Sequence, residues 1–493
     1  MELEKEYSCI ENNDLVLSKN ISIDKSYQET PEAYLDDICR VVRCTSHSYI
    51  TSCDIRDSCA YIMGKTEICL TYFNDSDELI YTDFVEDFDE TVEIGNVSEN
   101  AFCYATVCDK YCNYRMINQR RIDIHSSFCI SLYVYDKKSC SCISKCENSK
   151  LQLNKSKVAC VDNAVLSKLD IEESFVLPSN SNGIKRVVCF NVECGSVETK
   201  IIKDKILVKA SMSLYVLYSN NDNCLDRAEY SFDVSKIVDV PGVDEACHCI
   251  AKLCNGSLFV KAKSTDEDNG GVIDIYGDLY LTCVTVREKI QELVFDGYVL
   301  NADTSNKYST FNCLSGCEMS CRSNSSKLNF ELQNEIVKVE FLCVTPHQCS
   351  IKNNKLIVEF EICLMYAGKD NTLQYVNQIK AVEQNVTSVD LANDIRITSF
   401  DYTISGDKTI CVNISYDYCG YCGNEASYNI LSEMEIIQER KSYPALTLYF
   451  AKQNERVWDI AKQFSSDIEM IKKENNITGD CLETNKVILI PGI

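Results

Sequence analysis

The chain has 493 residues, with 74 Asp and Glu against 49 Lys and Arg, which gives a formal net charge of −25 at pH 7. This charge argues against nucleic acid and anionic lipid as partners, because both bind clustered Lys and Arg. No apolar run approaches the ~20 residues of a membrane-spanning helix, and the acidic start of the sequence is unlike a secretory signal. We therefore expect a multidomain protein that stays in the cytoplasm.

Predicted strands follow one another from the beginning of the chain. Residues 13–23 and 60–72 have strand-like patterns, and residues 79–93 form an acidic strand. Calcium binding by these acidic side chains is the alternative to a solvent-facing strand edge, but no EF-hand spacing is present. Residues 102–107 and 122–135 are predicted to close a first β-rich domain.

The clearest strand of the sequence is 206–218, where apolar residues alternate with Lys209, Ser211 and Ser213. The apolar positions are Ile206, Val208, Ala210, Met212, Leu214, Val216 and Tyr218. A period of two residues predicts a strand with one buried face.

This strand has relatives at 60–72 and 356–366. Each ends on a tyrosine, and Tyr72, Tyr218 and Tyr366 are spaced 146 and then 148 residues apart, which is a domain-sized period. The sequence therefore predicts a mainly β fold of three repeated, sandwich-like domains, followed by a small α+β module. The domains are predicted at 1–140, 160–300, 326–440 and 444–493, with polar linkers at 138–150 and 301–327.

The 31 cysteines are predicted to be reduced, buried thiols, and the alternative is a chain that is cross-linked later by oxidation. Many occupy predicted strand positions, where a reduced Cys behaves as a small hydrophobic residue, and an odd total cannot pair completely. Clustered cysteines are Cys140, Cys142, Cys146, Cys313, Cys317, Cys321, Cys419 and Cys422. A structural zinc site needs two pairs of ligands, or a pair with regularly spaced histidines, so we predict no metal site.

Catalytic signatures are absent from the sequence. It contains no G-x-S-x-G, no H-E-x-x-H and no phosphate-binding glycine loop. The four histidines, His47, His125, His248 and His347, fall in different local contexts. We therefore predict no catalytic residues, no cofactor and no enzyme activity.

The composition changes at Pro444, after which cysteines become rare and the only Trp appears. Residues 457–464 are amphipathic, with Val457, Ile460, Ala461 and Phe464 on one helical face. The predicted order is a strand at 446–451, helices at 457–464 and 468–474, and a strand at 487–491.

This βααβ segment resembles a LysM domain. The residues that fit the core pattern of that family include Tyr449, Val457, Trp458, Ile460, Ala461 and Ile490. Family members that bind N-acetylglucosamine polymers hold them between the loop after the first strand and the loop before the last. Here these loops contain Asn454, Glu455 and Arg456, and Thr484, Asn485 and Lys486, with asparagine at both characteristic glycine positions. Asparagine tolerates left-handed backbone, but close main-chain approach of a sugar depends on small residues.

The three β-rich copies resemble SPOCS domains, most clearly at residues 114–124 and 238–243. SPOCS repeats followed by LysM resemble the spore-coat morphogenetic proteins of endospore-forming bacteria. The resemblance implies a non-enzymatic assembly protein in the mother cell, at the forespore surface or spore coat, whose LysM module binds a coat-scaffold ATPase or other coat proteins. The alternative is a cell-wall protein that binds peptidoglycan, and a wall hydrolase comes third.

Overall fold

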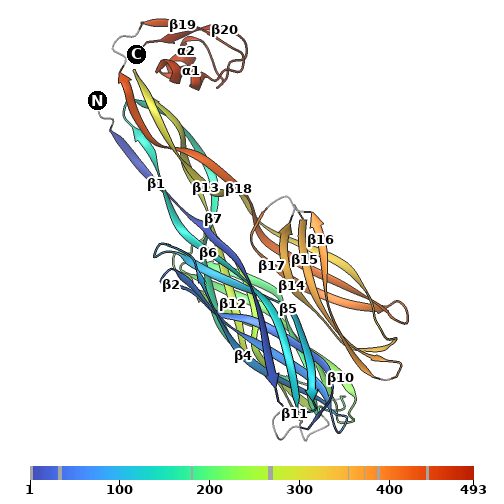
Figure 1. Cartoon of the computed structure of the whole chain (residues 1–493). Helices are drawn as coiled ribbons and strands as arrows, with labels where there is room; N and C mark the ends of the chain where they lie inside the picture. Colours follow the sequence, from blue (N-terminus) through green and yellow to red (C-terminus); the bar gives the residue numbers. More distant parts are fainter. Residues whose placement is uncertain are drawn as a thin grey trace.

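The computed structural model describes residues 4–30, 36–178, 181–264, 270–352, 355–370, 372–385, 389–439 and 444–492. It is mainly β, as predicted, with about 80% strand and two short helices. Figure 1 shows an elongated molecule: three β units lie at one end, long strands rise from them as a stem, and a small unit sits beyond the stem.

Within the described residues before 440, eighteen strands fall into three units of six. The first unit has β1 (Lys5–Glu29), β2 (Ile38–Arg56), β3 (Cys59–Asn74), β4 (Leu79–Glu93), β5 (Phe102–Asn118) and β6 (Arg121–Cys146). The second has β7 (Ser149–Val176), β8 (Arg186–Ile202), β9 (Lys205–Ser219), β10 (Leu225–Asp239), β11 (Cys247–Ser264) and β12 (Gly271–Val299). The third has β13 (Ala302–Glu331), β14 (Ile336–Lys352), β15 (Lys355–Gly368), β16 (Leu373–Asn385), β17 (Val389–Ile404) and β18 (Thr409–Glu439).

The same strand pairing occurs in every unit. The second, third and fourth strands form one antiparallel sheet, as in β2-β3-β4, and the sixth strand pairs with the first and the fifth, as in β1-β6-β5. Strand β13 also pairs with β7 at Leu314 and Ala159, so the larger sheets of the second and third units are continuous. The two sheets of each unit enclose a hydrophobic core between them.

Strand β9 shows how the sequence pattern becomes packing. Its even-numbered residues from Ile206 to Tyr218 are all buried, as the alternation predicted. Leu217 is also fully buried, although it lies on the opposite face. Leu217 belongs to a cluster with Leu79 of the first unit and Met365 of the third, so the three units share a further core outside their own sandwiches.

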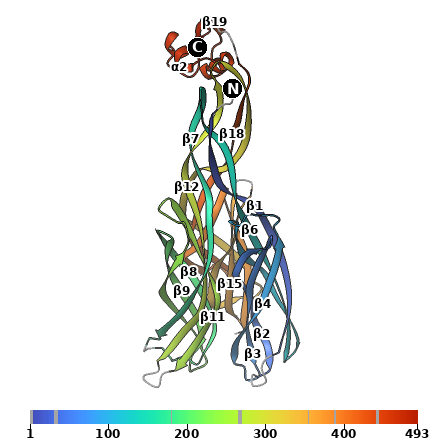
Figure 2. The ribbon, with the colours of Figure 1, turned by 90° about the vertical axis from the view of Figure 1, so that its left-hand side faces the viewer.

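The stem is built by the first and last strands of each unit. These six strands are 25 to 31 residues long and come together above the sandwiches (Figures 1 and 2). Their shared core includes Ile10, Cys142, Val158, Leu293, Phe311 and Ile430, which come from all three units. The stem therefore closes only when all three units contribute their strands.

The predicted polar linkers were wrong. Residues 138–150 are the ends of β6 and β7 around a turn, where Asn148 has a positive φ of 53°. Residues 301–327 lie almost wholly in β13, which pairs with β18 along its length. Ser, Asn and Lys are frequent there because a narrow stem buries few side chains, while the partner strand satisfies the backbone. The predicted domain limits at 140, 160 and 326 fall inside strands.

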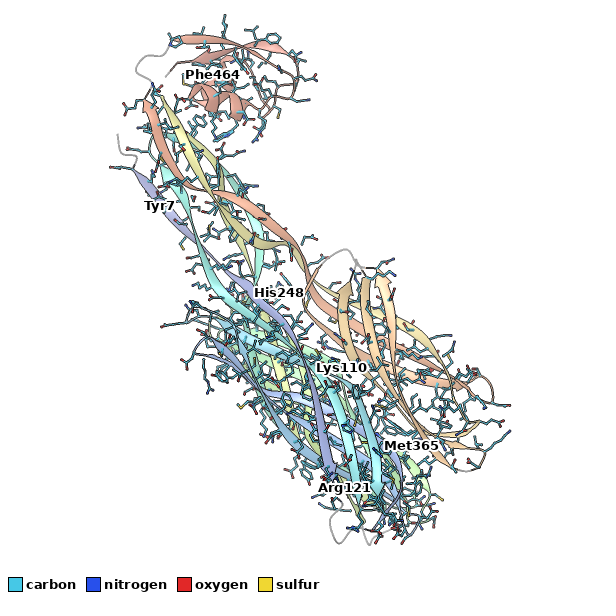
Figure 3. The ribbon with its side chains drawn as sticks, viewed as in Figure 1. Tyr7, Lys110, Arg121, His248, Met365 and Phe464 are labelled. Atoms are coloured by element: carbon cyan, nitrogen blue, oxygen red, sulfur yellow. A yellow bond between two sulfur atoms is a disulfide. The ribbon has the colours of Figure 1, made fainter. Side chains whose placement is uncertain are left out.

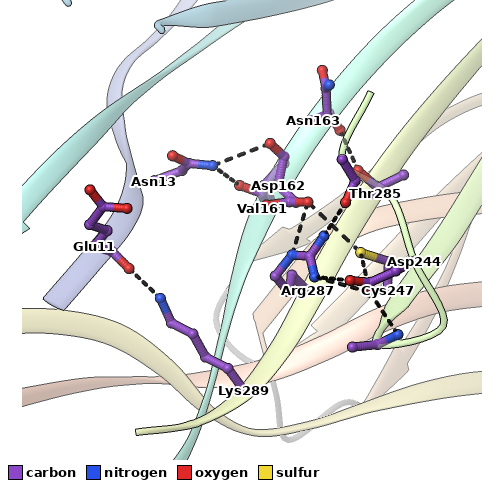
Figure 4. A network of polar contacts seen from close by, with 12 residues as sticks. Glu11, Asn13, Val161, Asp162, Asn163, Asp244, Cys247, Thr285, Arg287 and Lys289 are labelled. Atoms are coloured by element: carbon purple, nitrogen blue, oxygen red, sulfur yellow. Dashed lines mark hydrogen bonds and ion pairs between the residues drawn. The ribbon is translucent and has the colours of Figure 1, made fainter. Parts of the chain in front are cut away.

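Polar contacts also join the first unit to the second at the base of the stem (Figure 4). Within the second unit, Arg287 on β12 donates from Nε to Asp162 Oδ2 (3.1 Å) and from an Nη to Asp244 Oδ2 (2.9 Å), which fixes the segment that the first unit contacts. Asn13 on β1 donates from Nδ2 to the carbonyl of Val161 on β7 (3.0 Å). The hydrogen bond from Arg287 lowers the pKa of Asp244, so Arg287 forms a charged structural contact inside the second unit, beside the neutral contact from Asn13 that joins the two units.

Candidate functional site

The small unit at the far end of the stem carries all the residues predicted to bind a partner (Figures 1 and 2). It contains β19 (Leu446–Ala451), α1 (Val457–Phe464), α2 (Ile468–Glu474) and β20 (Lys486–Pro491), in the predicted order. The two strands pair antiparallel, with Leu448 opposite Leu489. Asp467 caps α2 through its side chain, which accepts from the backbone N–H groups of Glu469 and Met470.

The core of this unit comes from one face of α1 and from the sheet. Val457, Ile460, Ala461 and Ile490 are almost fully buried. Tyr449 is half-buried, and its ring meets Phe464 edge-on at 5.3 Å (Figure 3). Trp458 is also only half-buried, and its indole faces out of the unit toward the stem.

The two predicted binding loops lie against each other. The backbone N–H of Gln453 donates to Asn485 Oδ1 at 2.6 Å, and that of Asn454 donates to the carbonyl of Leu482 at 2.8 Å. Asn454 has a φ of 67°, the left-handed conformation for which glycine is favoured and asparagine is tolerated. Main-chain donors of the first loop are thus already engaged by the second loop.

Glu455 organises the first loop from within. One carboxylate oxygen accepts from the hydroxyl of Tyr449 and the other from the backbone N–H of Lys452, both at 2.8 Å. The hydrogen bond from the Tyr449 hydroxyl to Glu455 raises the pKa of Tyr449. Arg456 is exposed at the N-cap position of α1. It offers a charged group to a partner, whereas Glu455 has a structural role.

The second loop supplies a smaller set of side chains. Thr484 and Asn485 are exposed, while Lys486 is half-buried at the start of β20. A single backbone bridge between Arg456 and Cys481 joins the two loops on the side of α1. The six predicted residues therefore form two adjacent loops at one end of the unit.

The opposite side of α1 is fastened to the stem through Asp296 on β12. The indole N–H of Trp458 donates to Asp296 Oδ2 at 3.0 Å, and Lys462 Nζ donates to both carboxylate oxygens at 2.6 and 2.8 Å. Burial alone would raise the pKa of Asp296, but hydrogen bonds from Lys462, Trp458 and Tyr308 outweigh it and lower the pKa. The carboxylate is therefore a stable anion in this contact.

Backbone contacts extend the same anchor. The hydroxyl of Tyr298, which is buried, donates to the carbonyl of Ser466 at 2.9 Å, and its ring meets Trp458 edge-on at 5.2 Å. Ser465 Oγ donates to the carbonyl of Ala302 at 2.8 Å. Because Tyr298 belongs to the same core as the buried residues of the small unit, the unit is packed onto the end of the stem. No sequence pattern links these residues, so the anchor was missed.

The face of the sheet opposite the helices is apolar and open to solvent. Leu446, Leu448, Phe450 and Val487 are 52%, 69%, 63% and 57% exposed. Single exposed apolar residues are ordinary, but four neighbours on one two-stranded sheet form a patch of the kind that protein partners cover. The small unit, which forms the tip of the molecule, therefore presents polar loops at one end and an apolar face beside them.

A second candidate is a shallow pocket of about 230 Å³ beside His248, which Figure 3 labels. Its lining residues are Lys157, Glu245, Ala246, His248, Glu288, Lys289 and Ile290. Lys157 and Glu288 form an ion pair there, and Glu288 also accepts from the hydroxyl of Tyr421. Because Glu288 is paired with Lys157 and Tyr421, we interpret this pocket as a structural contact between strands and not as a binding site.

Cysteines in the described part of the chain do not form metal sites. No group of three or more His, Cys, Asp and Glu side chains is arranged to hold a metal within the described residues. Cys321 and Cys419 instead form a disulfide between facing positions of β13 and β18, which the spacing did not predict. The side chains of Cys317 and Cys422 lie outside the described residues.

Comparison with known proteins identifies one segment of the chain. Residues 183–253 match the model of a family described as SipL, SPOCS domain. The match spans β8, β9, β10 and the start of β11, so the SPOCS prediction is confirmed for the second unit. It indicates a sporulation-related protein. No curated protein and no solved structure matches the chain, and no helix among the described residues is long and apolar enough to cross a membrane.

Proposed function

We propose that the protein is a non-enzymatic assembly protein of the spore envelope. The observation that carries this proposal is the SPOCS match in the second unit, because the same pairing of six strands occurs in the first and third units. All three units are then SPOCS-like domains joined by one stem. We infer that a chain made of such domains acts by positioning surfaces that bind other proteins, since no catalytic constellation was found in its sequence.

The small unit is proposed to be a LysM module that binds a protein partner, a coat-scaffold ATPase or another coat protein. Its order of strand, helix, helix and strand and its buried Val457, Ile460 and Ala461 support the LysM interpretation. The exposed Arg456 and the apolar face with Leu448 and Phe450 support a protein as the partner. Interfaces commonly combine an apolar centre with a polar rim.

The loop geometry argues against the peptidoglycan alternative. A sugar between the loops would need main-chain donors and small residues. The N–H of Gln453 already donates to Asn485, and that of Asn454 to Leu482, so both donors are occupied before any ligand arrives. A glycan would have to open these contacts, which makes tight binding to peptidoglycan unfavourable.

The stem explains how one chain presents this surface. The anchor of Trp458 and Lys462 on Asp296 fixes the orientation of α1. The loops and the apolar face are thereby held away from the three β units (Figure 2). A partner bound at the tip would meet a pre-oriented surface, which reduces the ordering entropy that binding costs.

The test compares binding of the full-length protein to the coat-scaffold ATPase and to purified peptidoglycan. The variant Arg456→Thr installs the family residue without disturbing the hydrogen bonds of Glu455. Lys473→Thr is the matched control, because Lys473 is an exposed basic residue on α2. We expect Arg456→Thr to weaken ATPase binding about fivefold or more, which is on the order of 1 kcal/mol.

The control should bind the ATPase like the wild type, and no variant should sediment saturably with peptidoglycan. Saturable sedimentation of the wild-type protein with peptidoglycan, together with unchanged ATPase binding by Arg456→Thr, would favour the wall-binding alternative. Fluorescence microscopy of a tagged copy during sporulation tests the site of action independently. A signal that surrounds the forespore supports envelope assembly, and a signal on the vegetative wall contradicts it.

A further inference from the structure

The two sheets of the first unit meet along an edge where no backbone ladder joins them. Strand β2 is the edge of the sheet β2-β3-β4, and β5 is the edge of the sheet β1-β6-β5. They touch through side chains: Asp109 accepts from Ser48 Oγ at 2.7 Å and from its backbone N–H at 3.0 Å. This seam, β2 against β5, is held by side chains that reach across it, such as that of Asp109.

Two pairs of thiols lie on the seam, on either side of the contact between Ser48 and Asp109. Cys53 Sγ is 3.2 Å from Cys103 Sγ, and Cys44 Sγ is 3.6 Å from Cys112 Sγ. The pairs are nine residues apart on both strands, so they share one antiparallel register. A disulfide has a sulfur separation of about 2.05 Å, which small rotations of the side chains could reach from these positions.

Each pair combines a buried and a more accessible sulfur. Cys44 and Cys103 are buried, whereas Cys53 and Cys112 are half-buried. The hydrogen bond from Cys44 lowers the pKa of Cys112 and raises the pKa of Cys44. Cys112 is thus a partly accessible thiol with a lowered pKa next to a resolving cysteine, which is the arrangement that reacts with small oxidants. In the other pair the hydrogen bond to Cys103 and burial raise the pKa of Cys53, so that pair should be oxidised more slowly.

We propose that the pairs Cys44 with Cys112 and Cys53 with Cys103 are redox staples that join the two sheets of the first unit. The oxidant is a small soluble disulfide such as oxidised glutathione. The thiolate of the half-buried cysteine attacks one sulfur of the oxidant, and the first glutathione thiolate leaves. The buried partner, as its thiolate, then attacks the resulting mixed disulfide and releases the second glutathione.

The electron and proton balance of this step is complete. Two electrons pass from the two protein thiols to the oxidant, and their two protons go to the two departing glutathione thiolates. One protein S–S bond forms and one S–S bond of the oxidant breaks. The cross-links would enclose chain segments whose ends are 68 and 50 residues apart, which restricts the unfolded chain and stabilises the folded one.

Nearness alone does not select these pairs. Cys343 and Cys363 face each other on β14 and β15, but both are buried in the core that the three units share. Burial raises the pKa of both thiols and keeps a glutathione away. The exposed Cys39 and Cys224 are accessible, but their sulfur atoms contact the carboxylate of Asp75 and the carbonyl of Asp222, so they should stop at the mixed disulfide. At the seam, by contrast, each cysteine lies close to a second thiol, and one cysteine of each pair is only half-buried.

The test treats the reduced, folded, full-length protein with oxidised glutathione and maps disulfides by peptide mass spectrometry. We expect Cys44–Cys112 and Cys53–Cys103 as new cross-links, which remove four titratable thiols beyond mixed disulfides and beyond the two thiols of the Cys321–Cys419 bond. The melting temperature should rise by several degrees and return when dithiothreitol is added. Recovery of the Cys321–Cys419 bond shows that the conditions permit disulfide formation.

Variants separate the staples from other oxidation. The change Cys103→Ser with Cys112→Ser should reduce the shift in melting temperature to the part that the Cys321–Cys419 bond contributes in every variant, whereas Cys343→Ser should retain the full shift. If the double variant does not fold, the peptide map of the wild type decides alone. Mixed disulfides at the seam without these two cross-links, or the pair Cys343–Cys363 in their place, would overturn the proposal.

Discussion

The indole of Trp458 donates a hydrogen bond to a carboxylate 162 residues earlier in the chain, that of Asp296. Lys462, one helical turn further on, binds the same carboxylate. Tyr298, which follows Asp296 by two residues on β12, belongs to the same hydrophobic core as the buried residues of the small unit. The interface between the small unit and the stem is thus a small shared core with one half-buried anion at its side.

Removing that anion should loosen the tip. Asp296→Ala leaves Lys462 and Trp458 without their acceptor, and Lys462 is 34% exposed, so we expect a modest loss of about 1 to 2 kcal/mol in the stability of the small unit. Trp458 is the only Trp of the chain, so its fluorescence reports this contact directly. Asp459→Ala, at an exposed position of the same helix, should leave the spectrum and the unfolding curve unchanged.

Stability should fall as the pH rises from about 5 to 8. Burial raises the pKa of Glu67 and of Glu193 to about 8 each. Between their unfolded and folded pKa values the folded chain binds more protons than the unfolded chain, so the free energy of unfolding decreases with pH. Their contribution is fully present below pH 4.5 and is lost as the pH passes 8.

Glu67→Gln should reduce that slope. The amide cannot ionise, so the contribution of this position no longer changes with pH, and on the order of 1 kcal/mol per pH unit of the decrease should disappear. Urea unfolding at several pH values measures it. Glu86→Gln, at an exposed position on β4, is the control, and an equal slope in the wild type and Glu67→Gln would contradict the assignment.

Limited proteolysis should leave the stem intact. Residues 138–146 pair with β1, and residues 302–327 pair with β18, so their backbones are held in ladders that a protease cannot bind. We expect early cleavage at exposed loops such as 96–100, identified by mass spectrometry of the fragments. Early cleavage within 138–146 would show that these residues behave as the linker that the composition suggested.

Two leucines of β9 should report on different cores. Leu214 lies inside the second unit, and Leu217 lies between the units, both fully buried. Alanine at either position should cost about 2 to 5 kcal/mol. Hydrogen exchange should distinguish them: Leu217→Ala should accelerate exchange in the peptide around Met365 of the third unit, and Leu214→Ala should affect only the second unit's own strands.

Much of the local structure could be predicted from the sequence. The bounds of α1 and α2 were predicted to the residue because apolar positions recur at helical spacing and Asn475 ends α2. The buried face of β9 followed from strict alternation. In the stem, by contrast, strands rich in Ser and Asn lack that alternation, since their ladders supply the order and only a thin core supports them.

The sequence pointed only to those candidate residues that lie within short segments of the chain. Asn454, Arg456 and Asn485 were predicted from a resemblance to the LysM pattern, and the structure places them in two adjacent loops, with Asn454 in left-handed backbone. The anchor at Asp296 and the thiol pairs join residues that are far apart in sequence. Such contacts depend on how whole sheets pack, so they carry no periodic signal along the chain.

The stem also has a consequence for the order of folding during synthesis. Its core places Ile10, near the start of the chain, in the same cluster as Phe311 and Ile430. Strand β1 can therefore reach its final packing only after strands that lie about 300 residues or more further along the chain have been synthesised. Contacts of such sequence separation form late. The tip docks on residues of β12 and on Ala302 at the start of β13, which take their final positions only when the stem closes. The two loops with Arg456 and Asn485 therefore reach their final orientation only in chains that have completed all three units, so under the proposed function an unfinished chain would not offer this surface to a partner.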